Sequence, residues 1–181
     1  MKCHRAFCYN WDVGSPMAVT PSDFRAALRH FAAGVTVVTT RDAEGQPSGL
    51  TASAFTSVSL EPPLVLVCVD HQAASHPAFE AHGWFAVNVL ARNQAHLSRH
   101  FAESGGDKFS GVAFREGIAR LPLLEGVLAT VECRLIARHE AGDHTIFVGQ
   151  VEGVTVEGGH PLVYFRGEYH QLEPHGTPAR R

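Results

Sequence analysis

The sequence predicts a mainly β domain with a few helices, arranged as an antiparallel, Greek-key-like barrel. Runs rich in valine and threonine are separated by short turns that contain glycine, which is typical of strands joined directly to one another. About seven strands and three helices are predicted, and they do not alternate in a regular order. Direct strand-to-strand connections favour a barrel over a doubly wound parallel sheet.

The first predicted element is a helix that begins at Pro21. Thr20 can cap it, and Asp23, three residues later, gives an acidic variant of the capping box. One face of this helix is apolar, with the i, i+3, i+4, i+7 spacing of Phe24, Ala27, Leu28 and Phe31. Gly34 is predicted to end the helix as its C′ residue.

The remaining elements follow from residue type and periodicity. The predicted strands are 35–41, 64–70, 84–90, 127–138, 145–157, 162–165 and 168–172, and 46–59 is predicted as a strand that passes into an extended stretch. Turns are predicted at 42–45 and 140–143, where acidic residues and glycine lie between two strands. Short helices are predicted from Ser75 and over 93–103. Residues 104–126 are rich in glycine and are predicted to be irregular.

Composition excludes several classes of protein. The chain has 181 residues, 45% of them hydrophobic and 18% charged, with a formal net charge of −3. This length suits one domain with its own core, and the charge gives no basic surface for nucleic acid. The longest apolar run, 64–69, is far shorter than the ~20 residues that a membrane span requires. We therefore expect neither nucleic acid nor a membrane as a partner.

The two ends are predicted to lie outside the domain. Residues 1–19 read as a leader without periodicity, 20–172 as the domain, and 173–181 as a polar tail. The start has no apolar segment with a cleavage site, so we expect a cytoplasmic protein. Cys68 and Cys133 lie in apolar runs, where buried, reduced thiols are favoured over a redox or metal role.

The first candidate binding segment is 49–57, with the sequence Gly-Leu-Thr-Ala-Ser-Ala-Phe-Thr-Ser. Small residues and hydroxyls let a phosphate or a ribityl chain approach the backbone closely. A strand edge with small polar residues gives the same pattern, and the spacing alone favours that second interpretation. A GxGxxG motif after a strand and a P-loop are both absent from the sequence, so any nucleotide is held in another way.

Histidines supply the other candidates. His144 follows a Gly-Asp turn at the start of a long strand, where it could donate to a carbonyl or carboxamide, or move a proton near neutral pH. A surface histidine in a hairpin is the simpler interpretation of this position. His96 and His100 have the i, i+4 spacing of a metal-binding face, but no acidic or cysteine ligand completes a zinc motif. A solvated helix face is therefore favoured for this pair.

Five segments, in order along the chain, carry a family resemblance. They are FRxAL and FAxGVTVVTT within 24–40, GLTASxFTSVSLEPPLV at 49–65, FAVNVL at 85–90, GDHTIFVG at 142–149 and PLVYFRGxY at 161–169. Together they resemble the short-chain NAD(P)H:flavin reductase family, flavin reductase-like proteins with an FMN-binding split β-barrel. The resemblance extends over roughly residues 22 to 172.

The resemblance implies a homodimeric enzyme that reduces FMN or FAD with NADH or NADPH. Such an enzyme is often the reductase component of a two-component flavin monooxygenase, and its partner receives reduced flavin by diffusion. The implied flavin contacts are Thr51, Ala52, Ser53, Ala54 and Ser57 at the ribityl and phosphate groups, Cys68, Val69, Asp70 and Ser75 at the cofactor's border, Asn88 and Val89 along the isoalloxazine, and Lys108 at a phosphate. His144 matches the family's histidine at the nicotinamide pocket. Ala54 stands where the family commonly has Ser or Asn, which removes one polar contact to flavin.

Elementary chemistry agrees with this interpretation, because hydride transfer needs two stacked rings and the cofactor carries the reaction. No paired carboxylates are required. Two alternatives remain open. One is a non-enzymatic FMN-binding electron carrier or sensor on the same barrel. The other is a metal- or haem-binding barrel that uses the twelve histidines.

Overall fold

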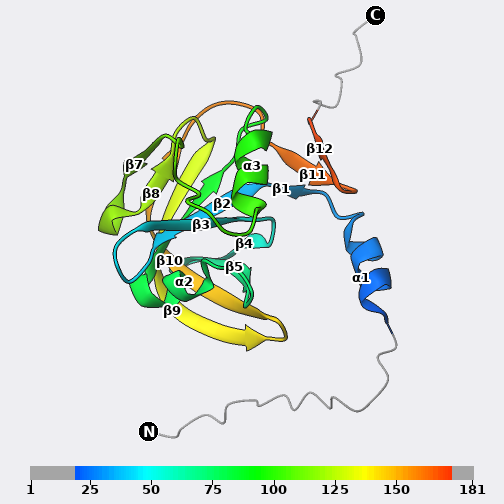
Figure 1. The fold of residues 1–181 in the computed structure, drawn as a ribbon, viewed down its shortest axis with the longest axis horizontal. Helices are drawn as coiled ribbons and strands as arrows, with labels where there is room; N and C mark the ends of the chain where they lie inside the picture. Colours follow the sequence, from blue (N-terminus) through cyan, green and yellow to red (C-terminus); the bar gives the residue numbers. More distant parts are fainter. Residues whose placement is uncertain (1–18, 173–181) are drawn as a thin grey trace, which may run out of the picture.

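The computed structural model describes residues 19–172, and its centre is one seven-stranded antiparallel sheet (Figure 1). The sheet order is β3-β2-β6-β9-β10-β5-β4. The strands are β2 (Thr36–Arg41), β3 (Pro47–Ala52), β4 (Phe55–Leu60), β5 (Pro63–Asp70), β6 (Trp84–Val89), β9 (Ala129–Ala141) and β10 (His144–Val156). The two edge strands, β3 and β4, are consecutive in the chain but do not pair. The predicted antiparallel, split barrel is therefore confirmed, with its opening between β3 and β4.

The other elements surround this sheet. Helix α2 (His76–His82) precedes β6, and α3 (Ala95–Ala102) packs on β2 and β3. Two small sheets complete the fold. The first consists of β1 (Ala33–Gly34), β11 (Val163–Phe165) and β12 (Glu168–His170). The second consists of β7 (Phe114–Glu116) and β8 (Pro122–Leu124), and a 3-10 turn, η1 (Ile118–Arg120), connects these two strands. Helix α1 (Pro21–Leu28) lies to one side of the barrel in the view of Figure 1.

Alternating side chains of the strands fill the core. Phe79, Phe85 and Phe147 meet inside the barrel, and the rings of Phe79 and Phe147 stack with centroids 5.4 Å apart. A second cluster lies under α3, where Phe101 packs with Val37 and other apolar side chains. Each such large side chain stabilises the fold by ~1.5–3 kcal/mol through burial. These two clusters hold the β3 edge, the end of β5 and the start of β10 in fixed relative positions.

The first helix differs from the sequence prediction at its end and in its packing. The predicted cap is confirmed, since the Asp23 N–H donates to Thr20 Oγ1 at 3.1 Å. The helix ends at Leu28 rather than before Gly34, because Ala33 and Gly34 pair with β11 as a short strand. The predicted apolar face is not buried against the barrel. Phe31 is 77% exposed, and no residue of α1 is buried.

Two other predictions need correction. Residues 46–59, predicted as a strand that passes into an extended stretch, form two strands, because the chain turns at Ser53 and Ala54 between β3 and β4. Residues 104–126 are not wholly irregular, since they contain the hairpin of β7 and β8. Leu121 and Leu123 of this hairpin region are fully buried beside Ala86. Short strands of this kind are fixed by tertiary packing and not by a local pattern.

Candidate functional site

A cleft of about 360 Å³ lies at the split of the barrel. Its walls come from the connection between β3 and β4, the end of β5 and the loop after it, the end of α3 and the loop after that, and the start of β10. The lining residues are Leu50, Thr51, Ala52, Ser53, Ala54, Cys68, Asp70, Gln72, Ala73, Ala74, Phe101, Ala102, Glu103, Ser104, Lys108 and His144. Segments far apart in the sequence therefore meet at one opening.

The wall at Thr51 to Ala54 is held by hydrogen bonds from neighbouring elements. Thr51 Oγ1 donates to the Ser98 carbonyl of α3 at 2.7 Å, and the Cys68 N–H donates to the Ala54 carbonyl at 3.0 Å. Ser53 and Ala54 are exposed at the turn. The Ser53 hydroxyl makes no hydrogen bond to any other residue between 19 and 172. This wall presents a small hydroxyl residue and little steric bulk to a ligand.

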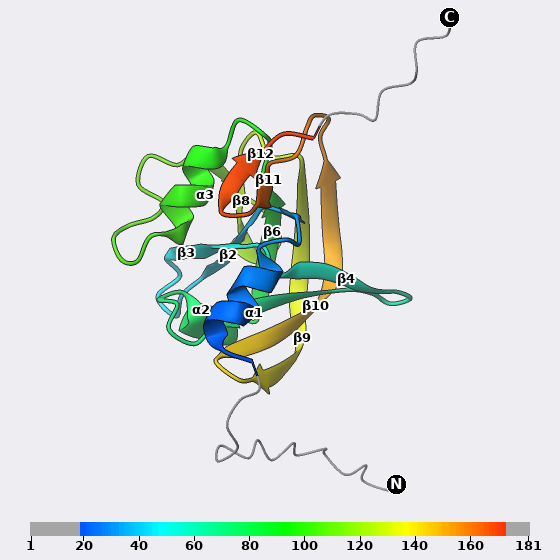
Figure 2. The same cartoon turned by 90° about the vertical axis from the view of Figure 1, so that its right-hand side faces the viewer.

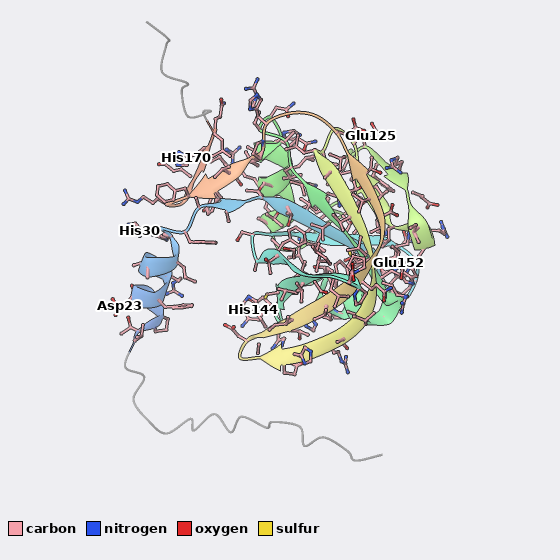
Figure 3. The ribbon with its side chains drawn as sticks, turned by 180° about the vertical axis from the view of Figure 1, so that it is seen from behind. Asp23, His30, Glu125, His144, Glu152 and His170 are labelled. Atoms are coloured by element: carbon pink, nitrogen blue, oxygen red, sulfur yellow. The ribbon has the colours of Figure 1, made fainter. Side chains whose placement is uncertain are left out.

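The opposite wall is set by the register of β5 and β10. His144 pairs with Asp70, and Ile146 pairs with Cys68, so side chains of both strands point to the cleft. The His144 side chain is 40% exposed, and its Nδ1 lies 2.7 Å from Asp143 Oδ1. This contact lowers the pKa of the Asp143 carboxyl below its ordinary value, chiefly through the hydrogen bond to His144. With Nδ1 engaged, Nε2 of His144 is the ring nitrogen available to a ligand. Figure 3 labels His144 near the tip of the β9–β10 hairpin.

Lys108 brings positive charge to the cleft. Its ammonium donates to the Phe101 carbonyl at 3.0 Å and to the Gly49 carbonyl at 3.4 Å. Burial lowers the pKa of Lys108, and the nearby Glu103 opposes that shift. Two carbonyl partners fix the position of the ammonium and leave it one further hydrogen to donate. A phosphate entering the cleft would find a preplaced cation.

Of the residues expected to contact a cofactor, eight line this cleft. They are Thr51, Ala52, Ser53, Ala54, Cys68, Asp70, Lys108 and His144. The other five, Ser57, Val69, Ser75, Asn88 and Val89, do not. Ser57 lies exposed on β4, Val69 is fully buried in the barrel core, and Val89 belongs to β6. Ser75 is buried, and its hydroxyl has no partner within residues 19–172. It lines a neighbouring pocket of about 120 Å³ together with Lys108.

Asn88 is also expected at the cofactor but lies in the core. Its amide nitrogen donates to the Val37 carbonyl at 3.0 Å and to Thr39 Oγ1 at 3.1 Å. Its amide oxygen accepts from the Leu124 N–H at 2.9 Å. The side chain is fully buried, and it ties β6 to β2 and β8. These contacts describe a structural amide within the described part of the chain.

Two segments of the cleft were missed by sequence reasoning. Residues 72–74 form the turn after β5, where Asp70 Oδ1 accepts from the Gln72 N–H at 2.8 Å. Residues 101–104 form the end of α3 and the start of the loop after it. Neither segment has a motif of its own. The one available signal was position, since 72–74 directly follow a predicted strand and 101–104 form the end of a predicted helix.

The other candidates lie elsewhere. His96 is exposed on α3, and His100 Nε2 lies 2.9 Å from the Lys108 carbonyl. In the described residues no group of three or more His, Cys, Asp or Glu side chains could hold a metal ion. Cys133 is a buried free thiol whose pKa rises to about 12, chiefly because burial disfavours the thiolate. Burial also raises the pKa of the Cys68 thiol, so neither group is an activated nucleophile.

Between residues 19 and 172, no helix has the length and apolar character to cross a membrane.

A larger cavity of about 740 Å³ lies between the ends of β6, β9 and β10, and it shares no residue with the cleft. The cleft is the stronger candidate because hydroxyl, cation and histidine converge there on one opening.

Comparison with known proteins places the chain in a family. Residues 28–173 match the model of the flavin reductase like domain. An NADH-dependent flavin reductase of Rhodococcus sp is 45% identical over 159 residues, covering 86% of this chain and 88% of that protein. The reductase subunit HsaB of a flavin-dependent monooxygenase from Rhodococcus jostii is 39% identical over 161 residues, covering 88% of this chain and 82% of that protein.

A solved structure agrees. The NADH:FAD oxidoreductase SgcE6 of Streptomyces globisporus, in complex with NAD and FAD fragments, has a TM-score of 0.81 and 38% identity. The match covers 88% of this chain and 99% of that chain. Family model, sequence relatives and structure thus agree over most of the domain, and they confirm the resemblance first drawn from five sequence segments: the chain belongs to the flavin reductase-like domain family, an oxidoreductase family of flavin reductases.

Proposed function

We propose that this chain transfers a hydride from NADH or NADPH to FMN or FAD, with both molecules meeting in the cleft at the split of the barrel. The observation that carries the proposal is the convergence of the 51–54 wall, Lys108 and His144 on one opening. The donor set fits a flavin, because the exposed Ser53 hydroxyl suits a ribityl chain and the Lys108 ammonium suits a phosphate. Bound flavin supplies the hydride acceptor, and the protein supplies orientation.

The chain's own residues have two tasks in this reaction. The 51–54 wall and Lys108 would hold the flavin's polar chain, and Cys68 and Asp70 would border the cofactor. His144 would donate from Nε2 to the carboxamide of the nicotinamide and so orient that ring for hydride transfer to the flavin. The cleft is small for two separate nucleotide sites. A single shared cleft explains how a domain without a dinucleotide-binding fold can use a nicotinamide.

Lys108 gives a direct test of where the phosphate lies. Lys108→Met is expected to weaken FMN binding about tenfold and to leave riboflavin binding unchanged, because only FMN carries the phosphate that the ammonium meets; one charge-assisted hydrogen bond contributes ~1.5–3 kcal/mol. Fluorescence titration of both flavins measures this. Arg92→Met, which removes an exposed cation outside the cleft, is the matched control. Equal losses for FMN and riboflavin would place the phosphate elsewhere.

A non-enzymatic FMN carrier or sensor is the alternative, and turnover distinguishes it from a reductase. The reductase oxidises NADH in the presence of a molar excess of flavin until one of the two is consumed. A carrier reduces at most its bound flavin and then stops. The steady-state assay should include each nicotinamide with riboflavin, FMN and FAD. If no combination of nicotinamide and flavin gives flavin-stimulated oxidation of the nicotinamide, the proposed function is wrong.

We also infer that the reduced flavin passes by diffusion to a partner monooxygenase. Relatives whose printed names describe reductase components support this, among them HsaB and the reductase component of a 4-nitrophenol monooxygenase from Rhodococcus opacus. The described part of the chain has no second domain that could carry an oxygenase. A cytoplasmic location belongs to the same proposal, and the free thiols of Cys68 and Cys133 suit that reducing compartment.

The exposed apolar surface supports a homodimer. Helix α1 has no buried residue, and an eight-residue helix is marginal without packing on its apolar face. The β4–β5 hairpin also extends from the barrel and carries Leu60, which is 88% exposed (Figure 2). A second copy of this chain offers complementary apolar surfaces through a two-fold axis. We assign that copy as the partner that covers Phe24, Phe31 and Leu60.

The dimer prediction is tested by sedimentation at micromolar concentration. The wild-type chain should sediment as a dimer, and Phe24→Ser with Phe31→Ser should shift it towards monomer by at least tenfold in Kd, because two large apolar side chains lose their burial. Ile118→Ser, which changes an exposed apolar residue on η1, should have no effect. A wild-type monomer would contradict the assignment.

A further inference from the structure

We propose that His71 is a positioning residue: it holds the turn that carries His144 against the loop that lines the cleft. The inference rests on the proposed function, because it explains how His144 is presented to the nicotinamide. His71 does not line the cleft. Its neighbours Asp70 and Gln72 both do, so it lies at the back of the wall that they form.

Strand β10 has two faces at this point, and His144 occupies only one of them. Successive side chains of a strand point in opposite directions. His144 therefore faces the cleft, whereas Thr145 faces the other way and is fully buried. Any contact that fixes the Thr145 side chain also fixes the backbone from which His144 projects.

Four side chains meet behind the cleft wall, and we name them the Thr145 cluster: His71, His76, Glu140 and Thr145. Thr145 Oγ1 lies 3.1 Å from His71 Nε2 and 2.9 Å from His76 Nε2, and it donates to Glu140 Oε1 at 3.4 Å. A hydroxyl has one hydrogen and two lone pairs. Because that hydrogen is directed to Glu140, both imidazoles donate from Nε2 to the two lone pairs. The Thr145 hydroxyl therefore has no hydrogen-bonding position left.

His71 is the member of the Thr145 cluster that joins three segments. Its Nε2 contacts Thr145 of β10 and lies 3.0 Å from Glu140 Oε2 of β9. Its backbone N–H donates to the carbonyl of Asp143 at 3.0 Å, one residue before His144. The loop after β5 and the tip of the β9–β10 hairpin are thus tied together on both sides of His144. The ring of His76 supports that of His71 in an edge-on contact with centroids 5.3 Å apart.

The contacts of His71 are local in their effect. Its side chain is 37% exposed and that of Glu140 is 70% exposed, so solvent weakens the contact between them and the global stability depends little on it. The loss of His71 should therefore loosen the hairpin tip without unfolding the barrel. A purely structural residue would instead lower stability and affect every substrate equally.

Four variants test the proposal: His71→Ala, His71→Gln, His139→Ala, and His71→Ala combined with His144→Ala. Glutamine places a donor near the position of Nε2 and should retain the contact to Thr145. His139 is exposed on β9 beside Glu140, and its side chain makes no hydrogen bond to the described residues, so His139→Ala is the matched control. Two readouts are needed: amide hydrogen exchange of residues 139–145, and steady-state kinetics for NADH and for flavin.

His71→Ala should speed exchange at the hairpin tip about tenfold and raise KM for NADH about fivefold, with less than twofold change in KM for flavin. His71→Gln should restore both values, and His139→Ala should match wild type. In the His144→Ala background, His71→Ala should add no further rise in KM for NADH. Unchanged exchange in His71→Ala, independent effects of the two substitutions, or no rescue by glutamine would each overturn the proposal. Hydrogen exchange needs no turnover, so an inactive wild-type protein refutes the proposed function separately.

Discussion

His144→Ala is expected to lower kcat/KM for NADH by ten- to hundredfold, while flavin binding changes less than twofold. The histidine stands at the start of β10 opposite Asp70, with Nδ1 held by Asp143 and Nε2 free to donate. Loss of one donor that orients a reacting ring costs ~1.5–3 kcal/mol of transition-state stabilisation. Because the proposed flavin contacts at 51–54 come from a different segment, we expect flavin to keep them. Steady-state kinetics with each substrate varied in turn measure the difference.

Two further variants make this result specific. His144→Gln, which keeps a donor, should recover part of the lost activity. Asp143→Ala should cause a smaller loss of the same kind, because the ring remains but is no longer held at Nδ1. A His144→Ala enzyme with unchanged KM and kcat for NADH would contradict the placement of the nicotinamide at this side of the cleft.

Asn88→Ala is expected to destabilise the fold by ~3–5 kcal/mol, the largest stability effect in our account. The substitution removes one hydrogen bond from each of three buried groups: the Val37 carbonyl, the Leu124 N–H and the Thr39 hydroxyl, which keeps only its bond to the Pro122 carbonyl. Buried polar groups that lose hydrogen bonds carry the full cost of desolvation. Urea unfolding of the protein should show the loss as a lower midpoint at an unchanged slope.

The control for Asn88 is Asn93, an exposed asparagine on the next loop. Asn93→Ala should change stability by less than ~0.5 kcal/mol. Flavin affinity of Asn88→Ala, measured where the protein remains folded, should stay within twofold of wild type. If the Asn88→Ala protein is stable but no longer binds flavin, Asn88 contacts the cofactor, as the family resemblance implies, and our structural interpretation of this residue is wrong.

The strands of the barrel could be predicted from sequence because their signals are local. Residues 64–70 and 145–157 form uninterrupted β-rich segments, and the structure has β5 and β10 within a residue or two of these limits. The turn at 140–143 placed His144 at a strand start by sequence alone. Register is not local, however, so the pairing of His144 with Asp70 that builds the cleft could not be predicted.

Tertiary context decided the other elements. The apolar spacing in α1 is that of a packed helix, but none of its residues is buried in the described part of the chain. Asn88 matches a family motif, and nothing in its spacing reveals that its side-chain amide makes hydrogen bonds to β2 and β8. The Thr145 cluster joins residues 71, 76, 140 and 145, which have no common pattern in the chain. Contacts of this kind emerge only when the strands are aligned.

The most direct test of the central claim is anaerobic mixing of the protein with excess flavin and NADH, followed by flavin absorbance. The account predicts that flavin well in excess of protein is bleached, that NADH is consumed in equal amount, and that NADH deuterated at the transferred position slows the reaction two- to fourfold. His144→Ala should slow it further at low NADH. Bleaching that stops at one flavin per protein chain, or no bleaching at all, would contradict hydride transfer between two substrates in this cleft.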